Sequence, residues 1–225
     1  MALAFVQVNQ TWPTTSATTT ALAYSSNVTA GSLLWCIVYW NNTGVTCTVA
    51  DGVNGSWTGI GTATVGAGGL ASFIGKMFYF PNAGAGATTV AATFSSAVTR
   101  RGIAIHEYSG ADTSSPLDQS AYVAVNSTGA TTPTITTTNA NDVIVAGCLA
   151  GTTTTGAAGG YTSRATPGAW SGNETEDQIV SATGTYGPNF TEGVANDNLV
   201  GIAAFKQASA GAAVVNTLAL LGVGT

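Results

Sequence analysis

Short segments with the pattern of β-strands recur along the whole chain, and Gly, Asn, Asp or Pro separates each from the next. Val90, Ala92 and Phe94 share one parity, which is the period of a strand with one buried face. Residues 33–40 and 142–149 are apolar at both parities, so we expect them to be central strands. This spacing predicts an all-β protein, an antiparallel β-sandwich. The expected strands are 3–8, 18–24, 33–40, 45–49, 56–62, 71–80, 88–94, 101–108, 120–126, 134–138, 142–149, 178–182 and 198–206.

The composition agrees with strands and excludes two other classes of protein. Only 7% of the 225 residues are charged and 45% are hydrophobic, whereas a disordered chain needs low hydrophobicity and high charge. Strong helix formers such as Glu, Lys, Gln and Met are scarce, which argues against a helical bundle. Thr, Val, aromatic residues and Gly suit pleated strands joined by tight turns.

The charge and the length of the apolar runs exclude two kinds of partner, nucleic acid and a membrane interior. Five basic and ten acidic side chains give a net charge of -5, too little positive charge to hold a nucleic-acid backbone. The longest nearly pure apolar run, 33–40, is far too short to span a membrane. The first ten residues alternate like a strand and do not resemble a secretory signal, so we expect folding in the cytoplasm of the producing cell.

The chain contains no charged linker between differently composed halves, which predicts one β-sandwich domain over residues 1–207. The remainder, 208–225, is an apolar tail without a charged side chain. Two interpretations stay open: a last strand on the protein's own sheet, or an arm that packs on a neighbouring subunit. The arm would use Val214, Val215, Leu218, Leu220 and Leu221.

The sequence contains no catalytic motif around its single histidine. A nucleophile triad needs a histidine base and an orienting acid. Glu107 follows His106 directly and would lie on the opposite face of the same strand. We therefore expect His106 at the surface or rim, and Arg101 and Glu107 at the solvated ends of this strand.

The acidic residues offer only weak candidates for catalysis or metal binding. Glu174, Glu176 and Asp177 form the densest group, which we expect in a solvated loop or edge strand. Asp112 and Asp118 flank a Pro-containing turn, where calcium is the one cofactor that the oxygen ligands allow. We expect no other cofactor and no enzymatic activity.

Aromatic and cysteine residues complete the set of candidates. Trp57, Trp170 and Tyr161 fall in or beside predicted loops, where an exposed ring can stack on a sugar, although the same rings can also cover the ends of a sandwich. Cys36, Cys47 and Cys148 lie among apolar neighbours and are expected to be buried thiols. A disulfide between the first two stays open.

Four segments, taken in order, resemble a known group of domains. They are DGVNGSWT (51–58), FYF with the Gly-rich turn and TTVAATF (78–94), IHEYSGADTSSPLD (105–118) and NLVGIAAFK (198–206). Together they are similar to jelly-roll-like β-sandwich domains of tailed-phage virion proteins and bacterial surface or adhesin-like proteins.

The resemblance implies display, decoration or glycan contact. It leads us to expect a structural virion protein, either a capsid decoration protein or a head or tail fibre subunit, that binds itself or the major capsid protein. Its location would then be the virion. The alternative is a carbohydrate-binding or adhesive module on an extracellular surface.

Overall fold

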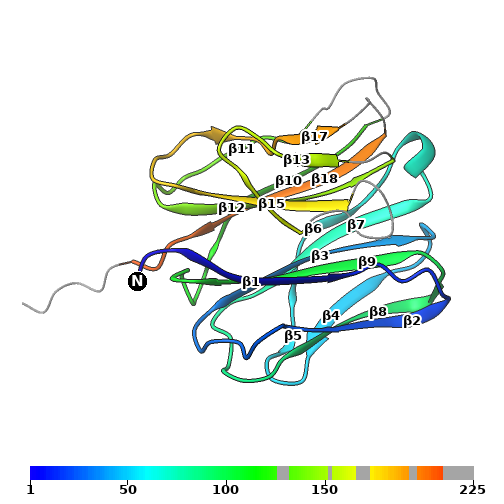
Figure 1. Cartoon of the computed structure of the whole chain (residues 1–225), viewed down its shortest axis with the longest axis horizontal. Coiled ribbons are helices and arrows are strands. Elements are labelled where there is room, and N and C mark those ends of the chain that lie inside the picture. Colours follow the sequence, from blue (N-terminus) through cyan, green and yellow to red (C-terminus); the bar gives the residue numbers. More distant parts are fainter. Residues whose placement is uncertain (126–131, 152–153, 166–172, 193–196, 210–225) are drawn as a thin grey trace, which may run out of the picture.

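Five antiparallel sheets are stacked in four layers in the computed structural model of the protein (Figure 1). The structure describes residues 1–125, 132–151, 154–165, 173–192 and 197–209. These residues form strands and one short 3-10 turn, Gly68–Leu70. The predicted all-β sandwich is therefore confirmed.

The first two layers come from the N-terminal half of the chain. Sheet I, the outermost layer, contains β2 (Ala17–Ala23), β8 (Thr89–Val98), β4 (Cys47–Asp51) and β5 (Gly55–Ser56), in that order. Sheet II lies above it and contains β1 (Ala4–Thr11), β9 (Arg101–Ser109), β3 (Leu33–Asn41), β7 (Phe73–Phe80) and β6 (Thr58–Val65).

The other two layers come from the C-terminal half. Sheet III faces sheet II and contains β10 (Leu117–Val125), β18 (Asn198–Lys206), β12 (Asp142–Ala150), β15 (Asn173–Val180) and β14 (Thr162–Ala165). Two small sheets form the last layer, which we call the cover. They pair β11 (Ile135–Thr136) with β16 (Thr185–Tyr186), and β13 (Thr154–Ala157) with β17 (Phe190–Glu192).

The two halves share one topology. Sheet II has the order β1-β9-β3-β7-β6 and sheet III the order β10-β18-β12-β15-β14, so the last strand of each half lies beside its first. Figure 1 shows the two halves facing each other, with sheet I and the cover on the outside. The predicted domain 1–207 thus consists of two like units, although its sequence shows no internal repeat.

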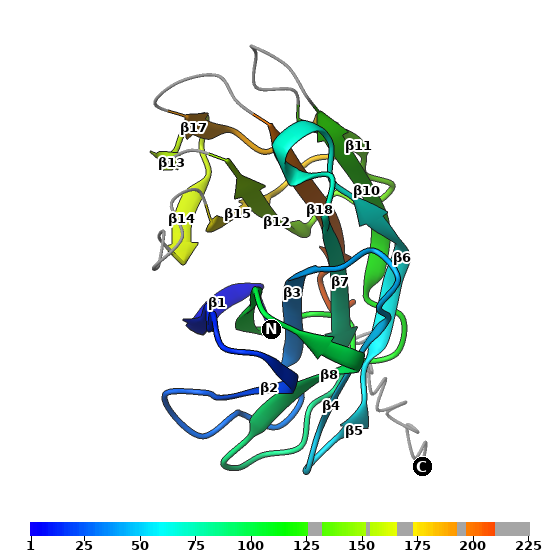
Figure 2. The same cartoon turned by 90° about the vertical axis from the view of Figure 1, so that its right-hand side faces the viewer.

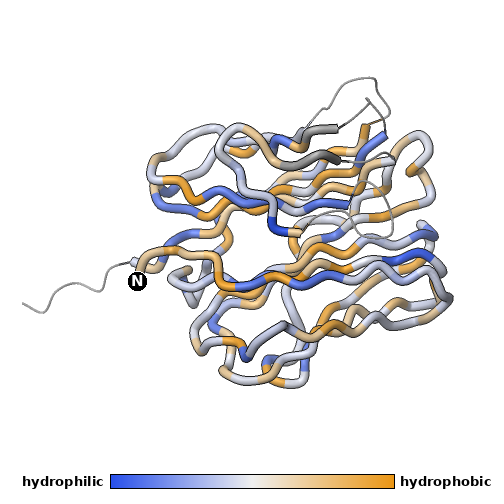
Figure 3. The backbone as a smooth tube through the Cα atoms, viewed as in Figure 1, coloured by the Kyte–Doolittle hydropathy of each residue, from blue (hydrophilic) through white to orange (hydrophobic). Residues whose placement is uncertain are grey.

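Strand β3 explains how the layers are held together. Alternate side chains of a strand point to opposite faces. Trp35, Ile37 and Tyr39 pack into the central core between sheets II and III, whereas Cys36 and Val38 pack into the core between sheets I and II. A third core lies between sheet III and the cover. Figure 3 shows hydrophobic stretches along the middle sheets, interrupted by hydrophilic ones.

One edge of the central core is closed by a tyrosine. The edge strands β6 and β10 lie side by side (Figure 2), and Tyr122 of β10 reaches across to sheet II. Its hydroxyl accepts a hydrogen bond from Met77 N at 2.8 Å and donates one to Ile60 O at 2.9 Å. Gly61 follows with a φ of +59°, a conformation that favours glycine, and the Tyr122 ring covers it.

Most long strands lie where the sequence predicts them, but parts of the C-terminal unit differ. The expected segment 178–182 is the end of β15, which begins at Asn173. Strands β13, β14, β16 and β17 lie outside the expected segments, because each has only two to four residues and lacks an alternating apolar pattern. The predicted arm from Val214 to Leu221 lies outside the described residues.

Candidate functional site

His106 is buried in the central core, so the expectation of a surface or rim histidine is wrong. Its side chain is 0% exposed and lies 4.8 Å from the Trp35 ring and 6.2 Å from the Tyr108 ring, between ring centroids. Burial, with a contribution from Arg164, lowers the pKa of His106 to about 3. Neither ring nitrogen has a hydrogen-bond partner. The histidine is therefore neutral near pH 7 and out of reach of a substrate.

Glu107 and Arg101 are also buried, which corrects their expected position at solvated strand ends. Glu107 lies on the sheet I side of β9, as its parity predicts. Its carboxylate accepts hydrogen bonds from Gln7 Nε2 at 2.6 Å, Thr29 N at 2.9 Å and Ser32 Oγ at 2.7 Å. Such a fully bonded carboxylate stabilises the packing of strands and loops around it and has no free oxygen for chemistry.

The acidic group on β15 is not solvated, so the expected loop or edge location is wrong. Glu174, Glu176 and Asp177 are each at most 2% exposed. The three acids divide between the two faces of β15, as alternation along a strand requires: Asp177 points to the central core, and the two glutamates point toward the cover. The strand brings these three acids into the interior because each finds a partner on a neighbouring strand or loop.

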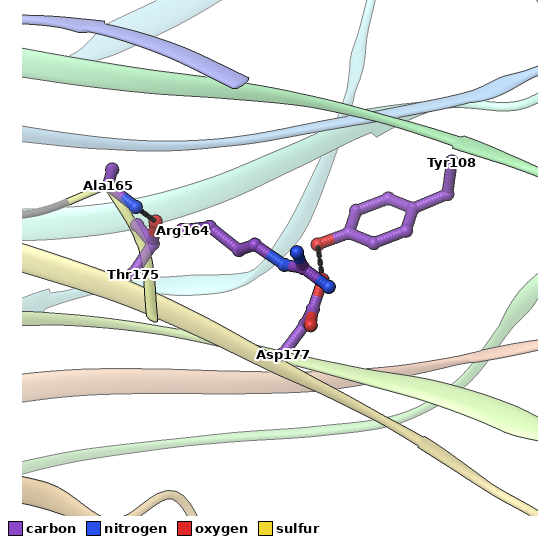
Figure 4. A network of polar contacts seen from close by, with 5 residues as sticks. All are labelled: Tyr108, Arg164, Ala165, Thr175 and Asp177. Atoms are coloured by element: carbon purple, nitrogen blue, oxygen red, sulfur yellow. Dashed lines mark hydrogen bonds and ion pairs between the residues drawn. The ribbon is translucent and has the colours of Figure 1, made fainter. Parts of the chain in front are cut away.

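Asp177 belongs to a polar network in the central core (Figure 4). Its Oδ2 accepts hydrogen bonds from the Tyr108 hydroxyl at 2.8 Å and from Arg164 Nε at 2.9 Å. The guanidinium also lies over the Phe5 ring, 3.9 Å from its centroid. Burial, and then the Asp177 charge, raises the pKa of Tyr108. The network joins β9, β14 and β15 and closes the second edge of the central core.

The two glutamates form a carboxyl pair under the cover. Glu174 Oε1 accepts a hydrogen bond from Ser163 Oγ at 2.5 Å, and Glu176 Oε1 accepts one from Asn189 N at 2.6 Å. The second oxygen of each carboxyl group and the hydroxyl of Tyr161 are buried without a hydrogen-bond partner. Burial raises the pKa of Glu176 to about 8, and the charges of Glu174 and Asp177 add to the effect.

The other acidic candidates, Asp112 and Asp118, have separate partners. Asp112 accepts hydrogen bonds from Ser114 N and Ser115 N, 2.8 and 3.0 Å away, and so completes its own turn. Asp118 interacts with Asp142 of β12. In the described part of the chain no group of three or more His, Cys, Asp or Glu could hold a metal ion. Calcium binding stays a prediction.

The aromatic candidates occupy different environments. Trp57 is only 6% exposed, so its ring packs in the core between sheets I and II and offers no face to a sugar. Tyr161 is half-buried against the third core, and Trp170 lies outside the described residues. A role of Tyr161 or Trp170 in glycan binding stays a prediction.

Replacing Trp57 with Ala is expected to destabilise the protein by about 3–5 kcal/mol, the usual cost of removing a large buried aromatic ring. The Trp57 ring fills the core between sheets I and II, and its indole N–H donates to Asp51 Oδ2 at 2.7 Å. Urea unfolding measures the effect, with Val53→Ala, at a 46% exposed position, as the control. Unchanged stability together with weaker glycan retention would contradict this structural role.

The three cysteines are free and buried, as expected, and no Cys36–Cys47 disulfide is present. Burial raises the pKa of Cys36 well above its usual value and that of Cys47 to about 12. These thiols are therefore protonated and unreactive at neutral pH.

No known protein family, curated protein or solved structure matches this chain. In the described residues no helix is long and apolar enough to cross a membrane.

Proposed function

We propose that this protein is a non-enzymatic structural subunit of a virion, either a decoration protein of a phage capsid or part of a head or tail fibre. The observation that carries the proposal is the location of its charges. An enzyme concentrates ionisable groups in an accessible cleft. Here the described chain keeps most of them inside, where they tie strands together.

Among the described side chains, Arg100 is the only ionisable one that is exposed. The half-buried acids are Asp112, Asp118 and Asp197. Six acids are buried: Asp51, Glu107, Asp142, Glu174, Glu176 and Asp177. The described part of the surface consequently carries few charges, and most of those are half-buried, unlike the surface of most soluble domains.

The outer face of sheet I shows what this surface is made of. Thr19, Thr93 and Thr48 form one row across β2, β8 and β4, and Ala21, Ala91 and Ala50 form the next. When such a face packs against another protein, only small neutral side chains are removed from water. The free-energy cost of desolvating a charge is avoided. This property supports an assembly role for the protein.

The proposal is tested by incubating purified protein with capsids that lack it and measuring co-sedimentation. Binding at a fixed copy number per capsid, resistant to high salt, is expected because few charges are available for the contact. Mass spectrometry of native particles provides the second test. Absence of the protein from particles in both experiments would overturn the proposal.

Removing residues 210–225 is expected to reduce particle binding or self-association at least tenfold, because this apolar segment is the predicted arm. The truncation retains the described chain up to Ser209, including the hydrogen bond from Ala208 N to Gly110 O. Light scattering and co-sedimentation measure the effect, and thermal unfolding is the control. A lower melting temperature with unchanged assembly would instead indicate a strand packed on its own sheet.

A further inference from the structure

The cover is attached to sheet III partly through carboxyl groups. Ile135, Tyr186 and Phe190 of the cover pack on the third core. At one end of the layer, Asn189 N donates to Glu176. At the other end, Thr138 N donates to Asp118 Oδ2 at 2.7 Å, and the Thr138 hydroxyl donates to the other oxygen.

At each end the carboxyl group that accepts the hydrogen bond lies next to a second carboxyl group. Glu174 and Glu176 share one face of β15, and their unbonded oxygens are buried. Asp118 of β10 and Asp142 of β12 lie on the two strands that flank β18. Asp142 is 0% exposed, and neither of its oxygens accepts a hydrogen bond from a described N–H or hydroxyl group. Asp118 and Asp142 share a side-chain hydrogen bond, which requires a proton because two carboxylates cannot donate to each other. Glu174 and Glu176 each keep one buried oxygen without a donor, so burial beside a second acid favours a protonated carboxyl group there too.

The equivalent layer of the N-terminal unit is attached differently. There the buried carboxylates are Glu107 and Asp51, and both receive hydrogen bonds from neutral donors. Sheet I can therefore stay packed on sheet II without a shared proton. The dependence on protons is confined to the cover.

We propose that protons held within the two carboxyl pairs keep the cover closed on sheet III, and that the cover loosens as these protons are lost. Loosening would uncover the apolar outer face of sheet III, which includes Ile144, Ala146, Val200 and Ile202. This inference does not depend on the proposed function, because it concerns the isolated chain.

The direction of the pH effect follows from the pKa of each buried acid. Burial, together with Asp118, raises the pKa of Asp142 from 3.8 to about 7, and burial raises that of Glu176 from 4.5 to about 8. In the open form both groups regain ordinary pKa values. The closed form then holds up to two protons more than the open form, so closure weakens as the pH rises from about 5 to about 8 and is constant above it.

Among the described side chains, few other charges act on the two pairs. Lys206 of β18 favours ionised Asp142, and Asn189 N favours ionised Glu176, but burial outweighs both. Tyr161 interacts with Glu176 and with Tyr186 of the cover. Asp177, on the other face of β15, repels Glu176. His106 faces the central core, and its lowered pKa makes global unfolding easier at low pH, which is the opposite direction.

Hydrogen exchange followed by mass spectrometry between pH 5 and pH 9 tests the proposal. After correction for intrinsic exchange rates, protection of 184–190 and 135–138 is expected to fall at least about hundredfold from pH 5 to pH 8. The reason is that each proton held only in the closed form changes the equilibrium constant of closure by up to about tenfold per pH unit. Protection is then expected to level off. Residues 33–41 and 89–98 of the N-terminal unit serve as the internal reference.

Two substitutions mimic the protonated forms and provide the variants. Asp142→Asn keeps a donor toward Asp118, and Glu176→Gln keeps an acceptor for Asn189 N. The double variant is expected to lose most of the pH dependence, whereas Asp112→Asn, which removes a carboxylate from a surface turn, is expected to retain it. An equal fall in the double variant, no fall in the wild type, or an equal fall in the reference strands would each overturn the proposal. Restoration of protection at pH 8 by millimolar calcium would also overturn it, because a cation and not a proton would then neutralise the pairs.

Discussion

Replacing Arg164 with Met is expected to destabilise the protein by about 3 kcal/mol or more, since removing one partner of a buried ion pair leaves an uncompensated charge. Asp177 is the partner, and its side chain is only 3% exposed. Without Arg164 the carboxylate retains a single donor, the Tyr108 hydroxyl. Urea unfolding near pH 7 measures the loss.

A double-mutant cycle separates charge from packing at this position. Arg164 also covers the Phe5 ring, so part of the loss comes from lost contact area. In an Asp177→Asn background the same replacement is expected to cost much less, because the amide needs no counter-charge. An equal cost in both backgrounds would show that the arginine acts through packing alone.

Replacing Gly102 with Ala is expected to cost about 3 kcal/mol, because the added methyl group has no room and displaces a buried ring. A Cβ atom at this position would lie 1.6 Å from Cε3 of Trp12. Trp12 is 9% exposed and stacks on Tyr39, with ring centroids 6.1 Å apart. Denaturant unfolding and a red shift of tryptophan emission measure its displacement.

Gly52→Ala is the matched control, because an added Cβ there meets nothing within 4 Å. Its stability is expected to stay within about 0.5 kcal/mol of the wild type, as for most surface substitutions. In a Trp12→Ala background, Gly102→Ala is expected to have little further effect, since the ring is gone. A full additional loss would contradict the assignment of Trp12 as the obstructing group.

The strands that could be predicted from the sequence are those whose own residues are apolar enough to indicate burial. Strand β3 carries eight consecutive apolar residues, and the expected range 33–40 differs from the observed end by one residue. Strand β18 was predicted with its observed limits, 198–206. Both are central strands, so neighbours cover both faces and the pattern needs no distant partner.

Strand β15 could not be predicted, because its burial depends on partners elsewhere in the chain. Asp177 is neutralised by Arg164 and bonded by Tyr108, which is 69 residues away. The same limit applies to His106, whose polarity suggested the surface although flat aromatic rings surround it. Acidic and imidazole side chains look solvated until the donors and rings that cover them are known.

The repetition of topology was equally hidden in the sequence. Strands β3 and β12 occupy the same place in the two units, yet one reads LLWCIVYWN and the other DVIVAGCLA. Only hydrophobic character is shared, and many sequences satisfy it. Strand order, not residue identity, reveals the likeness.

The face-to-face contact of the two like units has a consequence for dilute solutions. In a protein of two separate chains such a contact would be a dimer interface, and its occupancy would depend on concentration. Here a connection of a few residues, between Ser109 and Leu117, joins the halves. A short tether of this kind gives an effective concentration of about millimolar, so the halves stay together at any dilution. The molecule therefore enters any larger assembly with its first association already made.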